Sequence, residues 1–403
     1  MQKTDWKLAQ KIDCSVQAYS WGCVGAEAYI ARLLNWTAPT LPMAEIWMGA
    51  HSKAPSKVSG LGLDEAIRQC PDEILGSLCV KKFGQGLPYL FKVLSAKEAL
   101  SIQLHPSKSE AELLHAKDPK NYPDDNHKPE IAIALDQLEA LLGFDSLKNI
   151  VRNLEAEPEI AIFLGSHWVK DLNLARNSTL EQQNQVLKKC FAELFALSLS
   201  ERAKLKTSTA SMAERLKRQK DLSPRGRWFV ELQQLYPEGD VGLFCLYFLK
   251  YATLNAGEAV FLKAGVPHAY LRGNIIECMA NSDNVVRAGL TPKFVDVETL
   301  AKIVVVEQEA LKQQLPETNN LGGQCFKVAV PEFEVHHWKS SAKALHIEAG
   351  QLSGPRIIMV TSGTVTCGSF CAKKGEVILL ADVCKVALEL SASGEIFMAR
   401  PNI

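Results

Sequence analysis

A long helical block between two strand-rich regions is the sequence feature that most constrains how this chain can fold. Residues 1–145 consist mainly of short β-compatible segments that end at Gly or Pro, and such segments return from about residue 253. Residues 146–235 instead place apolar side chains at helical spacing and contain few turn-forming pairs. We therefore expect a β domain whose strands come from both sides of a helical insertion.

Helix starts are predicted from capping-box spacing, in which Ser or Thr precedes Glu or Gln by three residues. This spacing occurs at Ser109 and Glu112, at Ser178 and Glu181, and at Ser211 and Glu214. After the second of these, helical periodicity predicts a buried stripe formed by Leu187, Cys190, Phe191, Leu194 and Phe195. The basic cluster KRQK at 217–220 is expected to be a solvated helix face.

The stretch NAGEAVFLKAGVPHAYLRG at 255–273 resembles the second half of the cupin signature, in which a turn with Gly and Pro presents a histidine into a β-barrel. Here that histidine is His268. Residues 373–394 repeat the pattern weakly, with Gly-Glu, an apolar strand and a turn, but no histidine at the turn. The repeat indicates two related jelly-roll halves, of which only the first keeps a ligand.

These patterns predict a mixed, mainly β fold with two cupin-like jelly-roll domains and an inserted α-helical domain. At 403 residues the chain is long for one hydrophobic core. The catalytic cupin-like domain is expected to be discontinuous, over residues 1–145 and 236–320. The helical domain is expected at 146–235, and a C-terminal cupin-like domain that lacks metal ligands at 321–403.

Charge and composition argue for a small ligand. Lys plus Arg number 45 and so do Asp plus Glu, so nothing favours nucleic acid or an acidic membrane as partner. The longest apolar run, at about 241–249, is too short to span a bilayer, and the N-terminus lacks the apolar core of a signal peptide. Eleven cysteines without a C-x-x-C pair indicate reduced thiols. We expect a cytoplasmic monomer.

Polar residues on a strand indicate a metal site. In SIQLHP, Gln103 and His105 share one face because side chains alternate along a strand, although a half-solvated strand would show the same pattern. Glu130 begins the strand EIAIAL, where alanines on its face indicate a crowded interior, and His268 completes the set. Two imidazoles, a carboxylate and an amide oxygen suit Zn²⁺ with an open position, and the set also accommodates Mn, Fe or Co.

Several longer motifs resemble the type I mannose-6-phosphate isomerase family. They are VQAYSWG at 16–22, AEIWMGAHSKAPS at 44–56, SIQLHP, NHKPE, GVPHAY and MANSDNVVRAGLTPK, in the family's order. The resemblance implies one zinc ion bound by Gln103, His105, Glu130 and His268, with Arg287 as the catalytic arginine. It also implies the reversible isomerisation of mannose 6-phosphate and fructose 6-phosphate.

Such a reaction moves a proton between C1 and C2 and stabilises an enediol(ate). Arg287 suits the stabilising role, because its high pKa makes it a poor base. Glu277 lies in the apolar strand NIIECMA, where burial would raise its pKa and suit it as the base, or where it pairs with a nearby arginine. Lys128 shares the face of Glu130; it could bind phosphate, shuttle a proton or lie on the surface.

The phosphate requires cations and hydroxyl donors. Candidates are Lys92, Lys128, Lys293 and Ser101, and an apolar strand around Lys92 means that this lysine needs a partner or a wet pocket. Glu45 and His51 could be catalytic or supporting, and Trp21 and Trp47 could line the pocket or pack in the core. No Gly-rich phosphate loop of the nucleotide-binding type appears. His127, next to Lys128, would face the other way in an extended chain. The other histidines are interpreted as structural or surface residues: His115, His167, His336, His337 and His346.

Two other functions fit the same pattern. A different cupin enzyme, such as an oxygenase or another sugar epimerase, would keep the metal site without the phosphate cations. A non-catalytic sugar-binding protein with two cupin domains would bind metal and ligand without exchanging the C2 proton.

Overall fold

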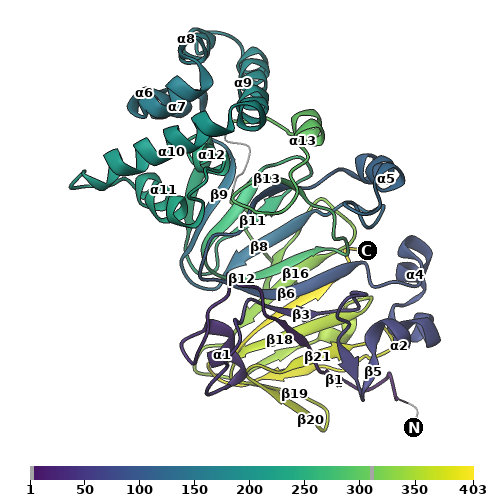
Figure 1. Ribbon diagram of the computed structural model, residues 1–403. Coiled ribbons are helices and arrows are strands. Elements are labelled where there is room, and N and C mark those ends of the chain that lie inside the picture. Colours follow the sequence, from purple (N-terminus) through teal and green to yellow (C-terminus); the bar gives the residue numbers. More distant parts are fainter. Residues whose placement is uncertain (1–3, 309–312) are drawn as a thin grey trace.

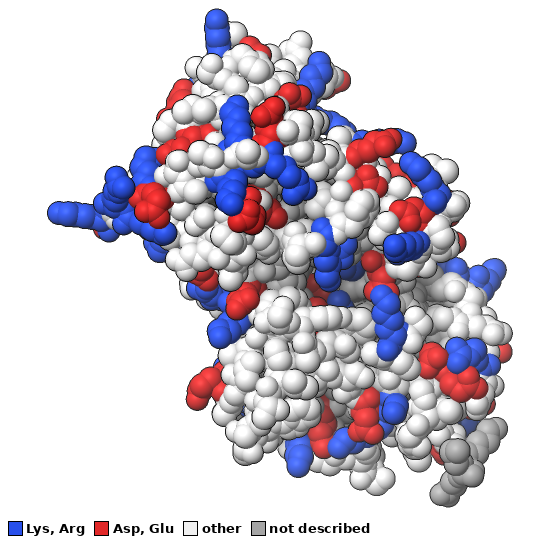
Figure 2. Space-filling view, in the orientation of Figure 1, with Lys and Arg blue, Asp and Glu red and all other residues white. Residues whose placement is uncertain are grey.

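The computed structural model describes residues 4–308 and 313–403, and it confirms a mixed fold with a helical insertion (Figure 1). The helical block lies at one end of the molecule, and the β-structured regions form the rest. No helix in the described part of the chain is long and apolar enough to cross a membrane. Basic and acidic side chains are interspersed on the face shown in Figure 2.

The first β region is a ten-stranded sheet centred on the long strand β12 (His268–Ala280). This strand is antiparallel to β6 and β8 along one half and to β7 and β9 along the other. Strands from before and after the insertion therefore pair directly, as the sequence predicts. The other nine are β2 (Ser15–Gln17), β3 (Glu45–Met48), β6 (Tyr89–Ala96), β7 (Ile102–Leu104), β8 (Glu130–Ala134), β9 (Leu138–Phe144), β10 (Leu249–Leu254), β11 (Ala259–Leu262) and β13 (Val286–Gly289).

The helical block packs around a core that includes the predicted stripe of α9, all five residues of which are buried. The cluster at 217–220 is exposed, also as predicted. The helices are α6 (Leu147–Ala156), α7 (Pro158–Leu164), α8 (Ser166–Ala175), α9 (Leu180–Ser200), α10 (Arg202–Lys217), α11 (Pro224–Leu235) and α12 (Gly242–Cys245). The insertion thus continues to residue 245, past the predicted end of helical sequence.

The predicted helix starts need correction. Helix α5 (Lys108–Lys117) begins at the capping box of Ser107 and Glu110, two residues before the predicted pair. Helix α9 begins at Thr179, whose box partner is Gln182. The predicted start at Ser211 is wrong, because α10 runs through it; the apolar face of α10 continues beyond that serine to buried Met212 and Leu216. Box spacing alone does not show which residue has the extended backbone that a cap requires.

The C-terminal region has a seven-stranded and a four-stranded sheet that enclose an apolar core. Strand β1 (Gln10–Ile12), from the N-terminal segment, pairs with β21 at an edge of the larger sheet. The larger sheet contains β1, β14 (Glu317–Thr318), β15 (Gln324–Phe326), β16 (Glu334–Lys339), β18 (Arg356–Ser362), β21 (Val377–Leu380) and β23 (Glu395–Arg400). The smaller contains β17 (Leu345–Ile347), β19 (Thr364–Cys367), β20 (Phe370–Lys373) and β22 (Leu388–Leu390).

A second apolar cluster joins the two β regions. It combines side chains such as Phe91 and Ile276 of the first β region with Met359 and Phe397 of the seven-stranded C-terminal sheet. The C-terminal sheet is therefore covered by this cluster on one face and by the C-terminal core on the other. Shorter elements complete the fold: α1 (Tyr29–Leu34), β4 (Lys57–Val58), β5 (Leu61–Gly62), α2 (Leu63–Gln69), α3 (Pro71–Ile74), α4 (Ser77–Phe83), α13 (Val297–Ile303) and the 3₁₀ turn Ala349–Gln351. All eleven cysteines are free and most are buried, as expected.

Candidate metal centre and surrounding groups

Strand register brings the predicted metal ligands to one face of the first β region. His268, at the start of β12, lies directly opposite Gln103 of β7, and Arg287 of β13 lies opposite Gln103 on the other side. Residues in register on neighbouring strands point to the same face. His105 is two residues beyond Gln103 and shares that face. Four polar side chains from three separate segments therefore converge.

His105, Glu130 and His268 form a compact buried cluster whose potential ligand atoms all lie within 4.8 Å of one another. The Nε2 atom of His268 is 3.0 Å from Oε1 of Glu130, and Nε2 of His105 is 3.3 Å from Oε2. At most 1% of each residue is exposed. The amide of Gln103 is on the same face and would add an oxygen ligand.

Hydrogen bonds to the backbone decide the tautomers of both histidines. Nδ1 of His105 lies 2.8 Å from the carbonyl oxygen of Asn284, and Nδ1 of His268 lies 3.0 Å from that of Val266. A carbonyl oxygen only accepts, so each Nδ1 carries a proton, and in the neutral imidazole each Nε2 keeps its lone pair.

Both Nε2 atoms and Oε2 of Glu130 are buried without a hydrogen-bond partner in the described structure. Lone-pair atoms that face one another in this way are unfavourable unless a cation binds between them. The donor set therefore fits a divalent metal ion.

The protonation states also suit a cation. Burial, reinforced by Lys128, lowers the pKa of His105 to about 4, so the imidazole is neutral near pH 7. Burial alone would raise the pKa of Glu130, but the ammonium of Lys128 is the largest of the influences that hold it well below its usual range. Neutral imidazoles and an ionised carboxylate are the forms that bind metals.

A second group of potential ligands, Cys325, Glu334 and His336, has similar spacing but different hydrogen bonding. The Oδ1 atom of Asn319 accepts two backbone N–H groups, so its Nδ2 donates to Nδ1 of His336 at 3.1 Å. His336 must then carry its proton on Nε2, which donates to Glu334 at 2.9 Å, and Arg400 donates to the same carboxylate at 2.8 Å. This cluster is a satisfied network, in agreement with a structural role for His336.

Lys92 lies at the centre of a second buried polar group on the strands next to the metal cluster. Its Nζ is 2.9 Å from Oε2 of Glu277 and 3.6 Å from Oε2 of Glu45, and it lies 5.5 Å from the ring centre of Trp47. The buried ammonium of Lys92 thus has the partners that it requires, the carboxylates of Glu277 and Glu45. The alternative that Glu277 pairs with an arginine is wrong, since its cation is Lys92.

The charges of this group are mutually dependent. Burial raises the pKa of Glu277, Lys92 opposes the change, and the net shift is upward. Burial would lower the pKa of Lys92, but the two carboxylates outweigh it and raise that pKa. The indole N–H of Trp47 donates to Glu45. Trp47 thus packs within this group.

Lys128 and Tyr270 both contact the carboxylate of Glu130. Lys128 is only 8% exposed, with Nζ 3.7 Å from Oε2, which excludes the interpretation as a surface lysine. The hydroxyl of Tyr270 donates to Oε1 at 3.1 Å. Tyr270 is not among the site residues predicted from the sequence. Its position two residues after His268, on the same strand face, was the available signal.

Arg287 is half-buried and makes no ion pair with any residue that the structure describes. Burial lowers its pKa, and the neighbouring hydroxyl of Tyr122 partly opposes this change. A partly desolvated guanidinium without a carboxylate partner is suited to an anion.

The other predicted binding residues lie apart from these buried groups. The Lys293 side chain is exposed, Ser101 is half-buried, and half-buried Trp21 stacks on Tyr19 with ring centres 5.7 Å apart and packs against the core. Within the described residues, no hydrogen bond or ion pair joins these three side chains to the metal cluster.

A cavity of about 400 Å³ lies at the end of β12, beyond Glu277. It is lined in part by His51, Lys53 and Asp283; Oδ1 of Asp283 is 3.4 Å from Nε2 of His51, and Oδ2 is 2.7 Å from Nζ of Lys53. Burial would raise the pKa of Asp283, but both partners lower it strongly. Asp283 is not among the residues predicted from the sequence, because its partners are about 230 residues away in the chain.

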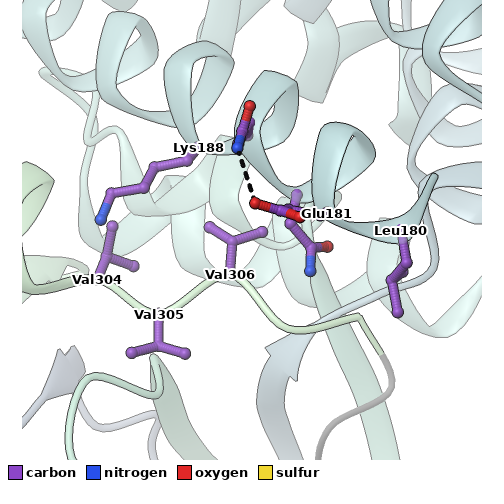
Figure 3. A pocket seen from close by; sticks show the side chains of 8 residues that line it. Leu180, Glu181, Lys188, Val304, Val305 and Val306 are labelled. Carbon is purple, nitrogen blue, oxygen red and sulfur yellow. Dashed lines mark hydrogen bonds between the residues drawn. The ribbon is translucent and has the colours of Figure 1, made fainter. Parts of the chain in front are cut away.

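A larger cavity of about 480 Å³ lies between α9 and the segment 304–306 (Figure 3). Three valines and Leu180 supply its apolar side chains, and Lys188 donates to the carbonyl oxygen of Lys302 at 3.1 Å. No potential metal-ligand cluster is among its lining residues. This cavity is therefore separate from the metal centre.

Comparison with known proteins identifies the family of the chain. The family model "Phosphomannose isomerase type I, catalytic domain" matches residues 9–147, and "Phosphomannose isomerase type I, helical insertion domain" matches residues 163–249. The mannose-6-phosphate isomerase of Bos taurus is 36% identical, with 96% of this chain and 97% of that protein covered. That of Candida albicans is 38% identical, with 88% and 87% covered.

Solved structures show the same likeness. A mutant phosphomannose isomerase from Salmonella typhimurium has a TM-score of 0.83 and 30% sequence identity, with 98% of this chain and 100% of that chain covered. A zinc-bound mannose 6-phosphate isomerase has a TM-score of 0.82 at the same identity and coverage. Together with the site geometry, these matches show that the chain is an isomerase that belongs to the type I phosphomannose isomerase family.

Proposed function

We propose that this chain interconverts mannose 6-phosphate and fructose 6-phosphate at a single zinc site, through an enediol(ate). The observation that carries the proposal is the buried set of His105, Glu130 and His268, whose lone pairs face one another. Arg287, in register with Gln103, has no ion pair within the described residues. The relatives named mannose-6-phosphate isomerase and the zinc-bound structural neighbour support the same substrate and metal.

The proposed ligands are Gln103, His105, Glu130 and His268. When bound there, zinc would polarise sugar oxygens or fix the orientation of the sugar. The chain's own contribution is to present neutral imidazoles in a fixed tautomer and to hold Glu130 through the Tyr270 hydroxyl.

Arg287 is proposed to stabilise the negative charge that develops on oxygen as the proton moves. Its guanidinium has donors for an oxyanion, and no carboxylate in the described structure competes for them. Its protonated state makes it a poor base, so another group must move the proton.

Glu277 and Lys128 are the proposed proton-transfer groups. Burial raises the pKa of Glu277 toward the working pH, which favours it as a base, and the ammonium of Lys92 holds its carboxylate in place. Lys128 lies next to Glu130 and would orient sugar oxygens or carry a proton. Substitution of each residue by its nearest neutral analogue, with C2-proton exchange as the readout, separates these roles.

Lys92, Lys293, Ser101, Glu45 and Trp21 are proposed to bind the substrate. The exposed ammonium of Lys293 has no ion pair within the described residues and is available to a phosphate group. Lys92 is already balanced by two carboxylates, so we expect it to contribute less to phosphate affinity than Lys293 does.

The proposed groups all come from residues 1–145 and 236–320. We therefore propose this discontinuous region as the catalytic domain and residues 321–403 as a C-terminal domain without metal ligands. The proposed helical domain covers 146–235, and the segment 236–245 with α12 extends the helical insertion into the start of the second catalytic stretch. Balanced charge supports a small phosphosugar as partner in place of nucleic acid or a membrane, and free cysteines support a cytoplasmic location. A monomeric state stays a prediction.

The test is to measure zinc content and isomerase activity on the same preparation. We expect about one zinc per chain and turnover of mannose 6-phosphate in a coupled assay. We also expect the sugar to take up solvent deuterium at C2 during turnover by the wild type or by an active-site variant. Zinc binding without turnover of mannose 6-phosphate would refute the proposed reaction, and turnover without any bound metal would refute the metal's role.

A further inference from the structure

A carboxylate of the helical insertion holds the backbone that follows the strand of Arg287. Asp240 lies between α11 and α12, and its Oδ1 accepts the N–H of Gly242 at 2.6 Å and the N–H of Leu290 at 2.8 Å. Its Oδ2 accepts the N–H of Thr291 at 3.3 Å. One side chain thus joins the last helix of the insertion to the end of β13.

Two glycines allow this joint to close. A Cβ atom on Gly289 would lie 2.6 Å from the backbone of Gly242, and a Cβ on Gly242 would lie 2.6 Å from the nitrogen of Leu290. Gly289 also has a φ of 136°, which other residues rarely adopt. The two backbones are therefore in direct contact, without side chains between them.

The segment that Asp240 holds is strained. Leu290 has a φ of 52°, an unfavourable left-handed conformation for a residue with a branched side chain. Such a conformation persists only where surrounding contacts impose it. The hydrogen bonds from Leu290 and Thr291 to Asp240 are contacts of this kind.

This joint lies two residues from Arg287. Between Arg287 and Gly289 the register of β13 against β7 shifts, so Ala288 forms an irregularity in the pairing. Such bulges change the direction of neighbouring side chains. The position of Arg287 relative to Gln103 thus depends on how the end of β13 is held.

We propose that Asp240 is a positioning residue for Arg287, through which the helical insertion sets the geometry of the active site. The inference rests on the proposed role of Arg287. It gives the insertion, which contributes no proposed ligand or catalytic group, a defined function in the reaction.

The test uses Asp240→Ala, which removes all three hydrogen bonds, and Asp240→Asn, which keeps an acceptor for Gly242 and Leu290 but presents an amide donor to Thr291. We expect Asp240→Ala to lower kcat by about 10- to 100-fold with little change in KM or zinc content, and Asp240→Asn to lower it less. Hydrogen exchange at the amides of Leu290 and Thr291 should accelerate. Asp382→Asn is the matched control, because Asp382 also accepts a backbone N–H, that of Gly354 at 2.6 Å, but in the C-terminal region. The kcat of this control variant should equal that of the wild type.

A double-mutant cycle distinguishes positioning from general destabilisation. If Asp240 acts through Arg287, then Asp240→Ala should not lower kcat further in an Arg287→Ala background. Equal losses in both backgrounds, or normal kcat in a folded Asp240→Ala variant, would overturn the inference while leaving the role of Arg287 intact. Normal kcat in Arg287→Ala alone would overturn both. Should Asp240→Ala not fold, the same cycle with Asp240→Asn, together with the amide exchange, decides the question.

Discussion

The substitution Arg287→Ala tests the proposed chemistry with little risk to the fold. Arg287 is half-buried and makes no ion pair within the described residues, so its removal leaves no buried carboxylate unpaired. We expect the free energy of unfolding to change by less than about 1 kcal/mol. The loss of one donor to a developing oxyanion costs about 2.7–4 kcal/mol, which corresponds to a kcat lower by about 100- to 1,000-fold.

The assay follows turnover of mannose 6-phosphate over a range of concentrations, with zinc content and thermal unfolding measured on the same samples. The control is Arg272→Ala, which removes an exposed arginine of β12 that pairs with Glu231 and lies 4.5 Å from the ring centre of Trp228. Its kcat should match that of the wild type. An Arg287→Lys variant keeps the charge but loses the planar fork, and should recover only part of the activity.

Three results would refute the reasoning. A kcat within about threefold of the wild type would show that Arg287 does not stabilise the transition state. A loss of zinc that parallels the loss of activity would show that Arg287 maintains the metal site instead. An increase in KM with unchanged kcat would place Arg287 in substrate binding, contrary to our proposal.

Other groups give separate predictions. His268→Ala should abolish zinc binding and turnover, and an active metal-free variant would contradict the ligand assignment. A chelator should also inactivate the enzyme. The helical circular dichroism should stay unchanged, since the helical block has no proposed ligand. Lys92→Met should lower stability to urea by about 3–5 kcal/mol, because it leaves Glu277 and Glu45 buried without their cation, and unchanged stability would contradict the pairing. In the metal-free protein, stability should fall as the pH drops from 6.5 to about 4, because the unfolded imidazole of His105 binds a proton in this range and the buried one does not. A urea midpoint that stays constant across that range would contradict this account.

Much of the candidate site could be predicted from sequence because its determinants are local. The alternation of side chains along a strand puts Gln103 and His105 on one face before any tertiary contact is known. The helical stripe of α9 follows from its period in the same way. The positions of the caps were less accurate, since Ser107 and Thr179 were selected over neighbouring residues by backbone conformation rather than by residue type.

Residue type and strand phase, which depend only on neighbours in the chain, were enough to propose the ligands and a helical insertion. The tertiary structure decided three other features: which tautomer His105 adopts, that Lys92 is the cation of Glu277, and that β1 joins the C-terminal sheet. Each of these features depends on contacts between segments that are distant in the chain. The link from Asp240 to Leu290 spans 50 residues of chain, and a carboxylate in a loop gives no local sign of the backbone that it will hold.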